Sequence, residues 1–377
     1  MTILFWVSVA VLVHAYAGYP LSLVLLRWLL GDRSRHRTGD DLPGITLVIS
    51  AYDEEKVIRQ KIENCLALDY PANRFECIVI SDGSSDATDA IVRAYQGQGV
   101  RLESFEGRSG KVACLNRVLP GLTSDLVAMS DANSMYAPDS LRRLARHFAD
   151  PRIGCVCGRL TYVNQRGLAS GEGERLYWSY EGWVKILESR LGSLLGANGA
   201  IYAYRRRLFR EVDPLMFCDD VIPIRIALAG YLTIYDPEAS CTEEAAEESV
   251  EIRRRRRHAS FGLRSMLRMM REALRQGRLL VAYQCLSHRV LRWAGGLALA
   301  GLLLSGISLP PPWGSFLLFG QGLFYGAAFL GFIMSRLRLR GVWLYMPYYF
   351  LVITAAGLVG LAMSVLRLDT PYWEPRR

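Results

Sequence analysis

Hydrophobic residues are concentrated at the two ends of the chain. Residues 3–30 are apolar except at His14 and Arg27. This run is longer than the roughly 20 residues that a helix needs to cross a bilayer. A signal peptide would show a basic amino end, a shorter apolar core and a small-residue cleavage site, none of which is clear here. We therefore predict a membrane anchor over residues 1–30, and the basic cluster at 33–37 places its carboxyl end on the cytoplasmic side.

Three further apolar runs lie near the carboxyl end, within residues 288–366. They cover residues 290–309, 313–335 and 342–366, and a triple proline at 310–312 separates the first from the second. Arginines at 336, 338 and 340 separate the second from the third and favour a cytoplasmic loop. The pattern predicts four spans with both termini outside. The tail 367–377 also carries arginines, so the sidedness of the last span stays open.

Between these ends, residues 42–250 alternate short apolar runs with amphipathic ones. Strands are expected at 45–51, 76–81, 100–105 and 125–130, and helices at 54–68, 86–96 and 111–119. Such alternation is typical of an α/β domain with a mostly parallel sheet covered by helices.

Two of the expected strands end in a carboxylate. Asp82 follows a buried run and opens the turn Asp-Gly-Ser-Ser, and Asp131 follows the strand at 125–130. Ligands of open α/β sheets bind at the carboxyl ends of the strands. The two acids therefore suggest an enzyme that handles a metal-bound nucleotide beside a membrane.

Composition narrows the partners and the compartment. The net charge of +9 comes largely from arginines near the expected membrane boundaries, which favours anionic lipid or phosphorylated substrates over nucleic acid. The eight cysteines contain one close pair, Cys155 and Cys157, whereas zinc sites usually need two such pairs. Free thiols in the middle of the chain indicate a reducing, cytoplasmic environment.

Six motifs in a fixed order resemble those of membrane-bound members of glycosyltransferase family 2, which have a Rossmann-like GT-A fold. They are Ser-Ala-Tyr-Asp-Glu-Glu at 50–55, Asp-Gly-Ser-Ser-Asp at 82–86, Gly-Lys-x-x-x-Leu-Asn at 110–116, Ser-Asp-Ala-Asn at 130–133, Gly-Ala-Asn-Gly-Ala at 196–200, and Asp219-Asp220. The resemblance covers about 200 residues.

The resemblance implies a nucleotide-sugar site. Tyr52 and Glu54 would line the nucleoside, Asp82 would accept a hydrogen bond from a uracil ring, and Lys111 would contact the diphosphate. The same residues also have ordinary structural explanations. Acids after the first strand suit a helix start, Asp82 fits an Asx turn, and Lys111 could lie in a solvated turn.

The resemblance also implies a metal and a base. Asp131 and Asn133 stand where the family often has Asp-x-Asp, and their oxygens suit Mn or Mg. Asp220 would be the general base and Asp219 would orient the loop, although paired acids at a helix start also suit the helix dipole.

A basic segment follows at 251–287. Arg254 and Arg257 would grip the diphosphate, or the whole arginine run at 253–257 would contact anionic lipid. The family's Gln-x-x-Arg-Trp is absent here. Arginines at 264, 268, 271, 275 and 278 recur at helical spacing, which predicts an amphipathic helix in the membrane interface, or one packed on the soluble domain.

The resemblance as a whole implies a metal-dependent, inverting hexosyltransferase in a bacterial inner membrane, with its catalytic domain in the cytoplasm. The donor would be a UDP-linked sugar. The acceptor would be a lipid-linked or growing glycan in cell-surface polysaccharide assembly. Transfer to a polyprenyl phosphate is the alternative reaction, and a non-catalytic scaffold or transporter is the alternative from another class.

Overall fold

The structure, a computed structural model, describes residues 1–163, 169–244, 248–337 and 342–366. The chain divides into two compact units. One is helical and is built mainly from both ends of the chain. The other is an α/β unit built from residues 26–163 and 185–244. Helix α2 begins in the helical unit and ends in the α/β unit, as does helix α7.

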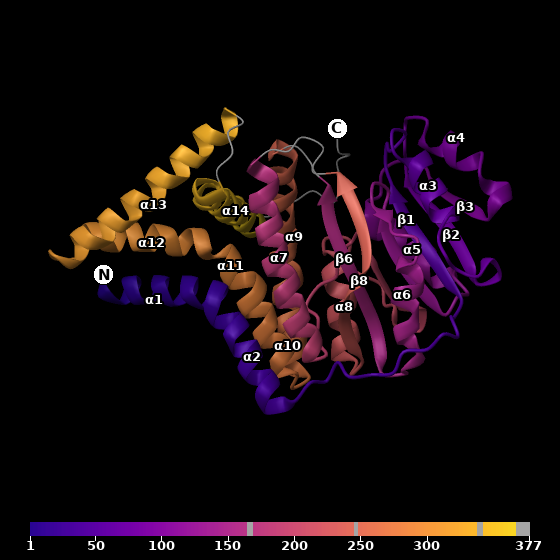
Figure 1. Ribbon diagram of the computed structural model, residues 1–377, viewed down its shortest axis with the longest axis horizontal. Coiled ribbons are helices and arrows are strands. Elements are labelled where there is room, and N and C mark those ends of the chain that lie inside the picture. The colour runs from indigo at the N-terminus through magenta and orange to yellow at the C-terminus, as the bar shows by residue number, and fades with distance from the viewer. Residues whose placement is uncertain (164–168, 245–247, 338–341, 367–377) are drawn as a thin grey trace. The chain divides into compact units, whose positions relative to one another are not determined.

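An eight-stranded mixed sheet forms the centre of the α/β unit, in the order β3-β2-β1-β4-β7-β6-β8-β5 (Figure 1). The strands are β1 Ile45–Ala51, β2 Phe75–Asp82, β3 Val100–Phe105, β4 Leu126–Asp131, β5 Met135–Tyr136, β6 Ile153–Val163, β7 Tyr202–Arg205 and β8 Leu232–Glu244. Strands β1 to β4 pair in parallel, as do β6 and β8, whereas β7 and β5 run antiparallel to their neighbours. The α/β prediction is confirmed.

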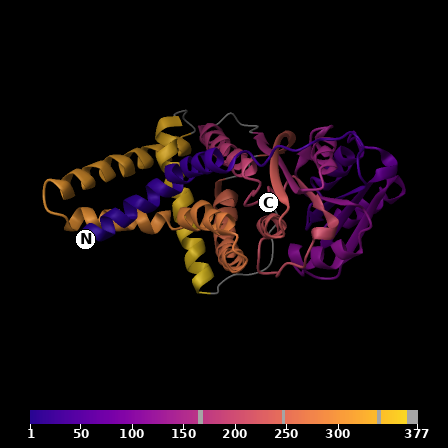
Figure 2. The ribbon, with the colours of Figure 1, turned by 90° about the horizontal axis from the view of Figure 1, so that it is seen from below.

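Helices pack along this sheet (Figures 1 and 2). They are α3 Ile58–Leu66, α4 Thr88–Arg93, α5 Lys111–Val118, α6 Ser140–Arg146 and α8 Cys218–Leu228. The parallel strands β1, β2 and β4 are buried almost throughout, because helices cover the sheet. The four strands β1 to β4 lie within two residues of their predicted bounds, and continuous apolar runs specify β1, β2 and β4.

Helix α3 differs from its predicted range. The sequence predicts a helix from residue 54, but α3 begins at Ile58. The segment before it is held by another loop instead, because the backbone N–H of Glu54 donates to Oγ1 of Thr88 at 2.8 Å. The hydroxyl of Thr88 thus accepts a hydrogen bond from an N–H group that would have no partner inside a helix beginning at residue 54.

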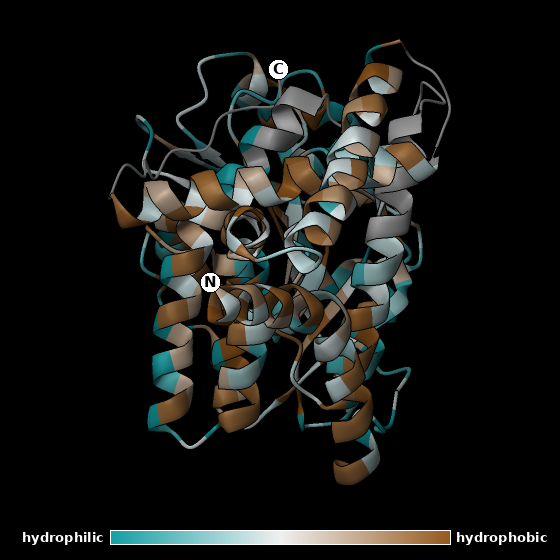
Figure 3. Cartoon of the chain, turned by 90° about the vertical axis from the view of Figure 1, so that its left-hand side faces the viewer, coloured by the Kyte–Doolittle hydropathy of each residue, from teal (hydrophilic) through white to brown (hydrophobic). Residues whose placement is uncertain are grey.

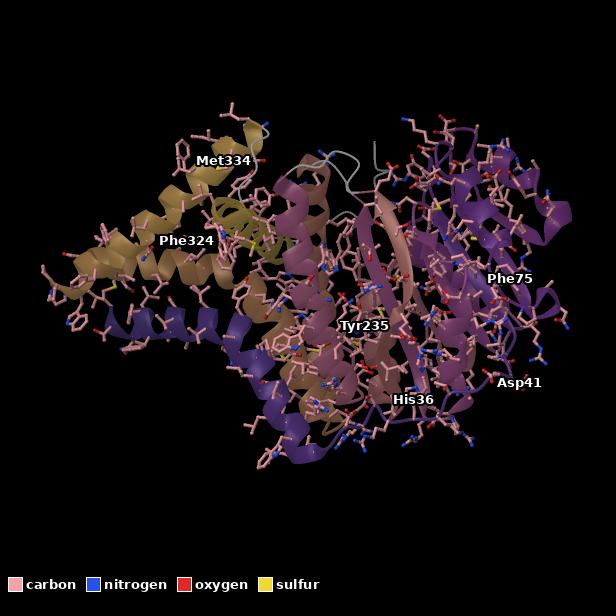
Figure 4. The ribbon with its side chains drawn as sticks, in the orientation of Figure 1. His36, Asp41, Phe75, Tyr235, Phe324 and Met334 are labelled. Atoms are coloured by element: carbon pink, nitrogen blue, oxygen red, sulfur yellow. The ribbon has the colours of Figure 1, made fainter. Side chains whose placement is uncertain are left out.

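The segment between α2 and β1 is attached to the α/β unit through histidines. Nε2 of His36, labelled in Figure 4, lies 2.6 Å from Nδ1 of His147. Nε2 of His147 in turn lies 2.8 Å from Oδ2 of Asp236 on β8, and both of these side chains are buried.

The helical unit contains η1 His14–Gly18, α1 Thr2–Val13, α9 Glu248–Arg275, α10 Leu279–Gln284, η7 Cys285–Val290, α11 Leu291–Trp293, α12 Gly295–Ser308, α13 Trp313–Arg336 and α14 Val342–Val365, together with most of α2 Tyr19–Leu30 and α7 Ala169–Arg190. Segments η1 and η7 are π-helical, and Nε2 of His14 in η1 lies 2.9 Å from Oγ of Ser287 in η7. Each π-helical segment is continuous with the helices on either side of it.

Three helices are long and apolar enough to cross a membrane, at Thr2–Leu30, Trp313–Arg336 and Trp343–Val365. The predicted span at 290–309 corresponds to a bent pair, Leu279–Trp293 and Gly295–Ser308, whose axes differ by 57°. The bend lies at Ala294, next to a pair of glycines that favour a kink. The described residues therefore provide three candidate spans, or four if the bent pair is one span.

Large apolar side chains on these helices are exposed. Trp28 is 79% exposed, Phe316 69% and Trp343 90%. Figure 3, coloured by hydropathy, shows many hydrophobic residues on the helices of this side of the chain. Apolar exposure on this scale marks a surface that contacts lipid or another apolar partner.

Polar contacts also occur inside the helical unit. Glu181 of α7 is buried and forms ion pairs with Arg292, and with His288 at 3.2 Å. Arg292 also donates to the hydroxyl of Tyr180 at 3.1 Å. A buried carboxylate requires such partners, because removing an unpaired charge from water is costly. This cluster joins α7 to the bent helix pair.

Helix α9 buries part of its length and exposes most of its basic residues. Phe261, Met266 and Met269 are buried, and α9 packs against α14. Arginines at 253, 256, 268, 271, 275 and 278, on α9 and just beyond its end, are exposed. Apolar side chains of α9 thus lie against another helix of the same unit, and the interface role of residues 251–287 stays a prediction.

Candidate active site

The carboxylate of Asp82 holds the loop that precedes α5. It lies at the end of β2, is 5% exposed, and accepts hydrogen bonds from the backbone N–H groups of Ser109 at 2.6 Å and Gly110 at 2.9 Å. The next residue, Gly83, has a positive φ of 71°, and a Cβ atom there would stand 2.6 Å from the backbone of Gly107. Asp82 and Gly83 thus fix this loop at the carboxyl edge of the sheet.

A second loop, at residues 52–55, is attached to residues 84–88. Oδ1 of Asp53 accepts from the backbone N–H of Ser85 at 2.8 Å, and the backbone N–H of Asp53 donates to Oγ of Ser84 at 3.1 Å. Asp53 has a φ of 50° and is the one non-glycine residue with positive φ in the described part of the chain. The two loops after β1 and β2 therefore form one hydrogen-bonded edge.

The ring of Tyr52, on this edge, is in contact with the guanidinium group of Arg108. The guanidinium carbon of Arg108 lies 3.8 Å from the centroid of the Tyr52 ring, which is a close cation–π contact. Tyr52 is half-buried, whereas Glu54 is buried. A flat aromatic face beside a guanidinium is suited to contact a base or a sugar.

Lys111 connects two carboxylates from distant parts of the chain. Its Nζ lies 2.9 Å from Oδ1 of Asp131 at the end of β4 and 3.6 Å from Oδ2 of Asp219 at the start of α8. The side chains are 20%, 34% and 19% exposed, respectively. Burial alone would lower the pKa of Lys111, but Asp131 and Asp219 raise it by more, so the net shift is upward. The ammonium thus stays charged and holds two carboxylates at one place.

Asp219 is fixed more firmly than an exposed acid. Its Oδ1 accepts from the hydroxyl of Tyr202 at 3.0 Å, and its backbone oxygen accepts from the N–H of Ala197 at 2.9 Å. A Cβ atom at Gly199 would stand 2.5 Å from Oδ2 of Asp219. The neighbouring Asp220 is 1% exposed. Asp219, not Asp220, therefore faces Lys111 and Asp131.

The comparisons with known proteins agree with this geometry. Residues 46–213 match the family model described as glycosyl transferase family 2. These residues form a glycosyltransferase family 2 domain. The match includes both loops, β4 and Lys111, and Asp219 follows it by a few residues. The prediction of this family and of its GT-A fold is confirmed.

Two curated relatives resemble the family 2 domain. The chain is 27% identical over 208 residues to a poly-beta-1,6-N-acetyl-D-glucosamine synthase of Staphylococcus aureus (strain COL), covering 54% of this chain and 50% of the relative. It is 31% identical over 217 residues to a beta-monoglucosyldiacylglycerol synthase of Synechocystis sp., covering 54% of this chain and 45% of the relative. The chain spans about half the length of the curated relatives it matches.

One solved structure resembles nearly the whole chain. It is a mannosyltransferase from Pyrobaculum calidifontis in complex with GDP-Man and Mn2+, with a TM-score of 0.71 and 21% sequence identity. The likeness covers 97% of this chain and 100% of the other. At this identity it shows a shared fold.

The oxygen donors of the family 2 domain suit a hard divalent ion that takes further ligands from elsewhere. Within the described residues, no group of three or more His, Cys, Asp or Glu side chains could hold a metal by itself. Asp131 provides a partly exposed carboxylate, and Asn133, half-buried in the turn after β4, provides an amide. Mg and Mn are often held by one or two carboxylates together with substrate phosphates. Asp131 and Asn133 fit this arrangement.

The predicted site residues are not all in one unit. The α/β unit contains most of them, namely Tyr52, Glu54, Asp82, Lys111, Asp131, Asn133, Asp219 and Asp220. Arg257 lies in the helical unit, where its guanidinium carbon is 5.7 Å from the ring centroid of Phe261. The side chain of Arg254 lies outside those that the structure describes. The diphosphate role of both arginines therefore remains a prediction.

Two residues at the site, Tyr202 and Arg108, have no role in the sequence-based prediction, and Asp53 appears there only among the acids of an expected helix start. Tyr202 binds Asp219, Arg108 covers Tyr52, and Asp53 joins the two loops. The alternation Tyr202-Ala203-Tyr204 is a strand signal that could have identified β7, and with it an inward-facing hydroxyl. No sequence pattern indicates the Arg108 contact.

Proposed function

We propose that this chain is a membrane-associated glycosyltransferase that moves a sugar from a nucleotide-sugar donor to an acceptor hydroxyl with inversion at the anomeric carbon. The main support is the convergence of Asp131, Lys111 and Asp219 at the carboxyl edge of the sheet. The donor is a UDP-sugar by resemblance, and the acceptor is a lipid-linked or growing glycan. The curated relatives include a polysaccharide synthase and a glycolipid synthase, which supports this acceptor class.

We assign the general base to Asp219 instead of Asp220. A base must reach the hydroxyl whose proton it takes, and Asp220 is 1% exposed whereas the side chain of Asp219 is 19% exposed and faces the other site residues. Asp219 would accept the proton of the acceptor hydroxyl. The acceptor oxygen then bonds to the anomeric carbon while the bond to the nucleotide phosphate breaks, and the electron pair leaves with the diphosphate.

The other residues bind and orient the donor. Tyr52 and Arg108 would contact the nucleoside, while Asp82 holds the loop that presents Lys111. Lys111 would contact the diphosphate oxygens, and its charge favours departure of that group. A divalent ion, Mn or Mg, held by Asp131 and Asn133 would neutralise negative charge on the leaving diphosphate.

The proposed location is a membrane with the α/β unit on the cytoplasmic side. Three candidate spans, or four, support membrane insertion. The eight cysteines are all free and buried, as is usual in a reducing compartment. The basic cluster at 33–37 after the first candidate span supports the same side.

Transfer to a polyprenyl phosphate is the second candidate. The exposed arginines of α9, in the unit that also holds the candidate spans, favour a lipid acceptor that carries phosphate. Such an acceptor is already ionised near neutral pH, so this reaction needs no general base. The two candidates therefore differ in how much the reaction depends on Asp219.

The test uses purified full-length protein in detergent with a panel of UDP- and GDP-sugars, with Mn, Mg or EDTA, and with glycan, glycolipid and polyprenyl-phosphate acceptors. We expect nucleotide release that needs a divalent ion, and inverted product. Asp219→Asn should lower kcat at least about 100-fold while nucleotide binding persists, and Asp220→Asn should lower it much less. Full activity of Asp219→Asn with a hydroxyl acceptor would contradict the assignment of the base.

A further inference from the structure

Two tyrosines on β7, two residues apart, differ in the contacts of their hydroxyls, and the ring of Tyr204 also lies 6.4 Å from that of Phe209. Tyr202 and Tyr204 are both fully buried, and their rings stack at a centroid distance of 6.0 Å and an interplanar angle of 23°. The hydroxyl of Tyr202 donates to Oδ1 of Asp219 at 3.0 Å. The hydroxyl of Tyr204 has no hydrogen-bond partner among the residues that the structure describes. The pair thus places a phenol beside the proposed base and an almost identical phenol away from it.

The contacts of Asp219 divide its two carboxylate oxygens between different neighbours. Oδ1 faces the hydroxyl of Tyr202 and the thiol of Cys218, at 3.0 and 3.4 Å. Oδ2 faces Lys111 and lies against Gly199. One oxygen is therefore held by donors from the protein interior, and the other lies on the side of Lys111.

Tyr202 keeps its proton at all physiological pH values. Burial raises the pKa of its phenol, and the negative charge of Asp219 raises it further. The same two causes raise the pKa of the Cys218 thiol. Both groups therefore remain donors to Oδ1 while Asp219 is ionised, and neither can take the proton of an acceptor.

We propose that Tyr202 is a positioning residue that holds Oδ1 of Asp219 so that Oδ2 takes the proton of the acceptor hydroxyl. This inference rests on the proposed function, in which Asp219 is the base. Tyr202 does not touch the substrate and keeps its own proton through the reaction. Its effect is on the direction of the carboxylate, and small errors in the direction of a reacting group slow the chemical step strongly.

The experiment compares Tyr202→Phe with Tyr204→Phe in the full chain. Both variants keep the ring and the burial and remove one hydroxyl. We expect Tyr202→Phe to lower kcat about 10- to 100-fold with the KM for the donor unchanged, and to lower the melting temperature because its hydrogen bond to Asp219 is lost. Tyr204→Phe should keep wild-type kcat and KM. Equal kcat values for the two variants, or a change in KM alone for Tyr202→Phe, would overturn the proposal.

Asp219→Asn separates this inference from the proposed function. If Asp219→Asn is fully active, the base assignment fails. If it is inactive while Tyr202→Phe has wild-type kcat, only the positioning role fails. Adding Tyr202→Phe to Asp219→Asn should cause no further loss of kcat, because the two residues act as one unit.

The hydrogen bond between Tyr202 and Asp219 can also be tested without measuring catalysis. A double-mutant cycle on thermal unfolding pairs Tyr202→Phe with Asp219→Ala, and a control cycle pairs Tyr204→Phe with Asp219→Ala. We expect coupling in the first cycle and additivity in the second. Additivity in both cycles would show that the phenol does not hold the carboxylate, whatever the substrate of the enzyme.

Discussion

Gly199 lies against the carboxylate of Asp219 so closely that a methyl group at residue 199 would stand 2.5 Å from Oδ2. Real Cβ atoms do not approach other atoms this closely, so the carboxylate would have to rotate. We predict that Gly199→Ala lowers kcat at least about 10-fold, because the carboxylate of Asp219, the proposed base, would turn away from its present orientation. Steady-state kinetics with the accepted donor would measure this effect.

The control for this prediction is Gly97→Ala, where a Cβ atom would meet no atom within 4 Å. It should keep wild-type kcat. The melting temperature of Gly199→Ala should fall only as far as in Tyr202→Phe, because rotation of Asp219 breaks its hydrogen bond to Tyr202 without moving the backbone. Unchanged kcat in Gly199→Ala would show that the direction of Asp219 does not limit the reaction.

Lys111 provides the positive charge between Asp131 and Asp219, and its removal leaves two carboxylates without their shared partner. We predict that Lys111→Met raises the Kd for a nucleoside diphosphate at least about 10-fold, since one charge-assisted contact is lost. Lys111→Arg keeps the charge and should bind more tightly than Lys111→Met. Calorimetric titration of UDP, with and without Mn, measures both, and equal affinities of Lys111→Met and wild type would refute a role in diphosphate binding.

Asp53 has a positive φ, and its Oδ1 accepts two hydrogen bonds from Ser85, one from the backbone N–H of Ser85 and one from its hydroxyl. Asparagine tolerates this backbone conformation and still offers an acceptor oxygen. We therefore predict that Asp53→Asn changes the unfolding free energy by less than about 1 kcal/mol, whereas Asp53→Ala lowers it by about 1–3 kcal/mol. Denaturant unfolding of the two variants checks the difference.

Asp53→Gly divides this effect into its two parts. Glycine accepts the backbone conformation but lacks the acceptor, so it should be more stable than alanine and less stable than asparagine at this position. An alanine variant as stable as the asparagine variant would mean that neither the backbone conformation nor the contact with Ser85 matters.

Asp236 should make the stability of the α/β unit depend on pH in the acidic range. Burial alone would raise its pKa, but the hydrogen bond from His147, the backbone N–H of Glu238 and the charge of Arg146 lower it overall. A carboxyl group with a lowered pKa stabilises the fold above its unfolded pKa of about 4 and loses this contribution as the pH falls through its folded value. We predict that the wild-type melting temperature falls below about pH 4.

The comparison variant is Asp236→Asn, which cannot ionise. It should melt lower than wild type at neutral pH, and its melting temperature should change less between pH 5 and pH 3. Parallel acid dependence of the two proteins would assign the effect to other carboxylates, such as Asp150, whose pKa the neighbouring Arg152 also lowers.

The sequence predicted the sheet well and the loops less well, for a physical reason. Strands β1, β2 and β4 are continuous apolar runs, so their own composition specifies them. The loop at residues 52–55 carries acids that resemble a helix start, but its N–H groups bind side chains more than 30 residues away. Such tertiary contacts leave no local pattern.

The same limit applies to the proposed base. Asp219 and Asp220 are adjacent and chemically identical, and only the direction of α8 and the positions of Tyr202 and Lys111 distinguish them. Hydropathy likewise located the apolar run at 290–309 but could not indicate its 57° bend, because bending leaves composition unchanged.

The burial of every native thiol gives the folded protein a practical property. All eight cysteines are free and covered, so water-soluble maleimides should react with the native chain only as it unfolds. A cysteine introduced at an exposed position, such as Arg33 or Arg271, would then be the sole rapidly labelled site, with no need to remove the natural ones. Labelling of intact and opened cells would report directly which side of the membrane each segment occupies.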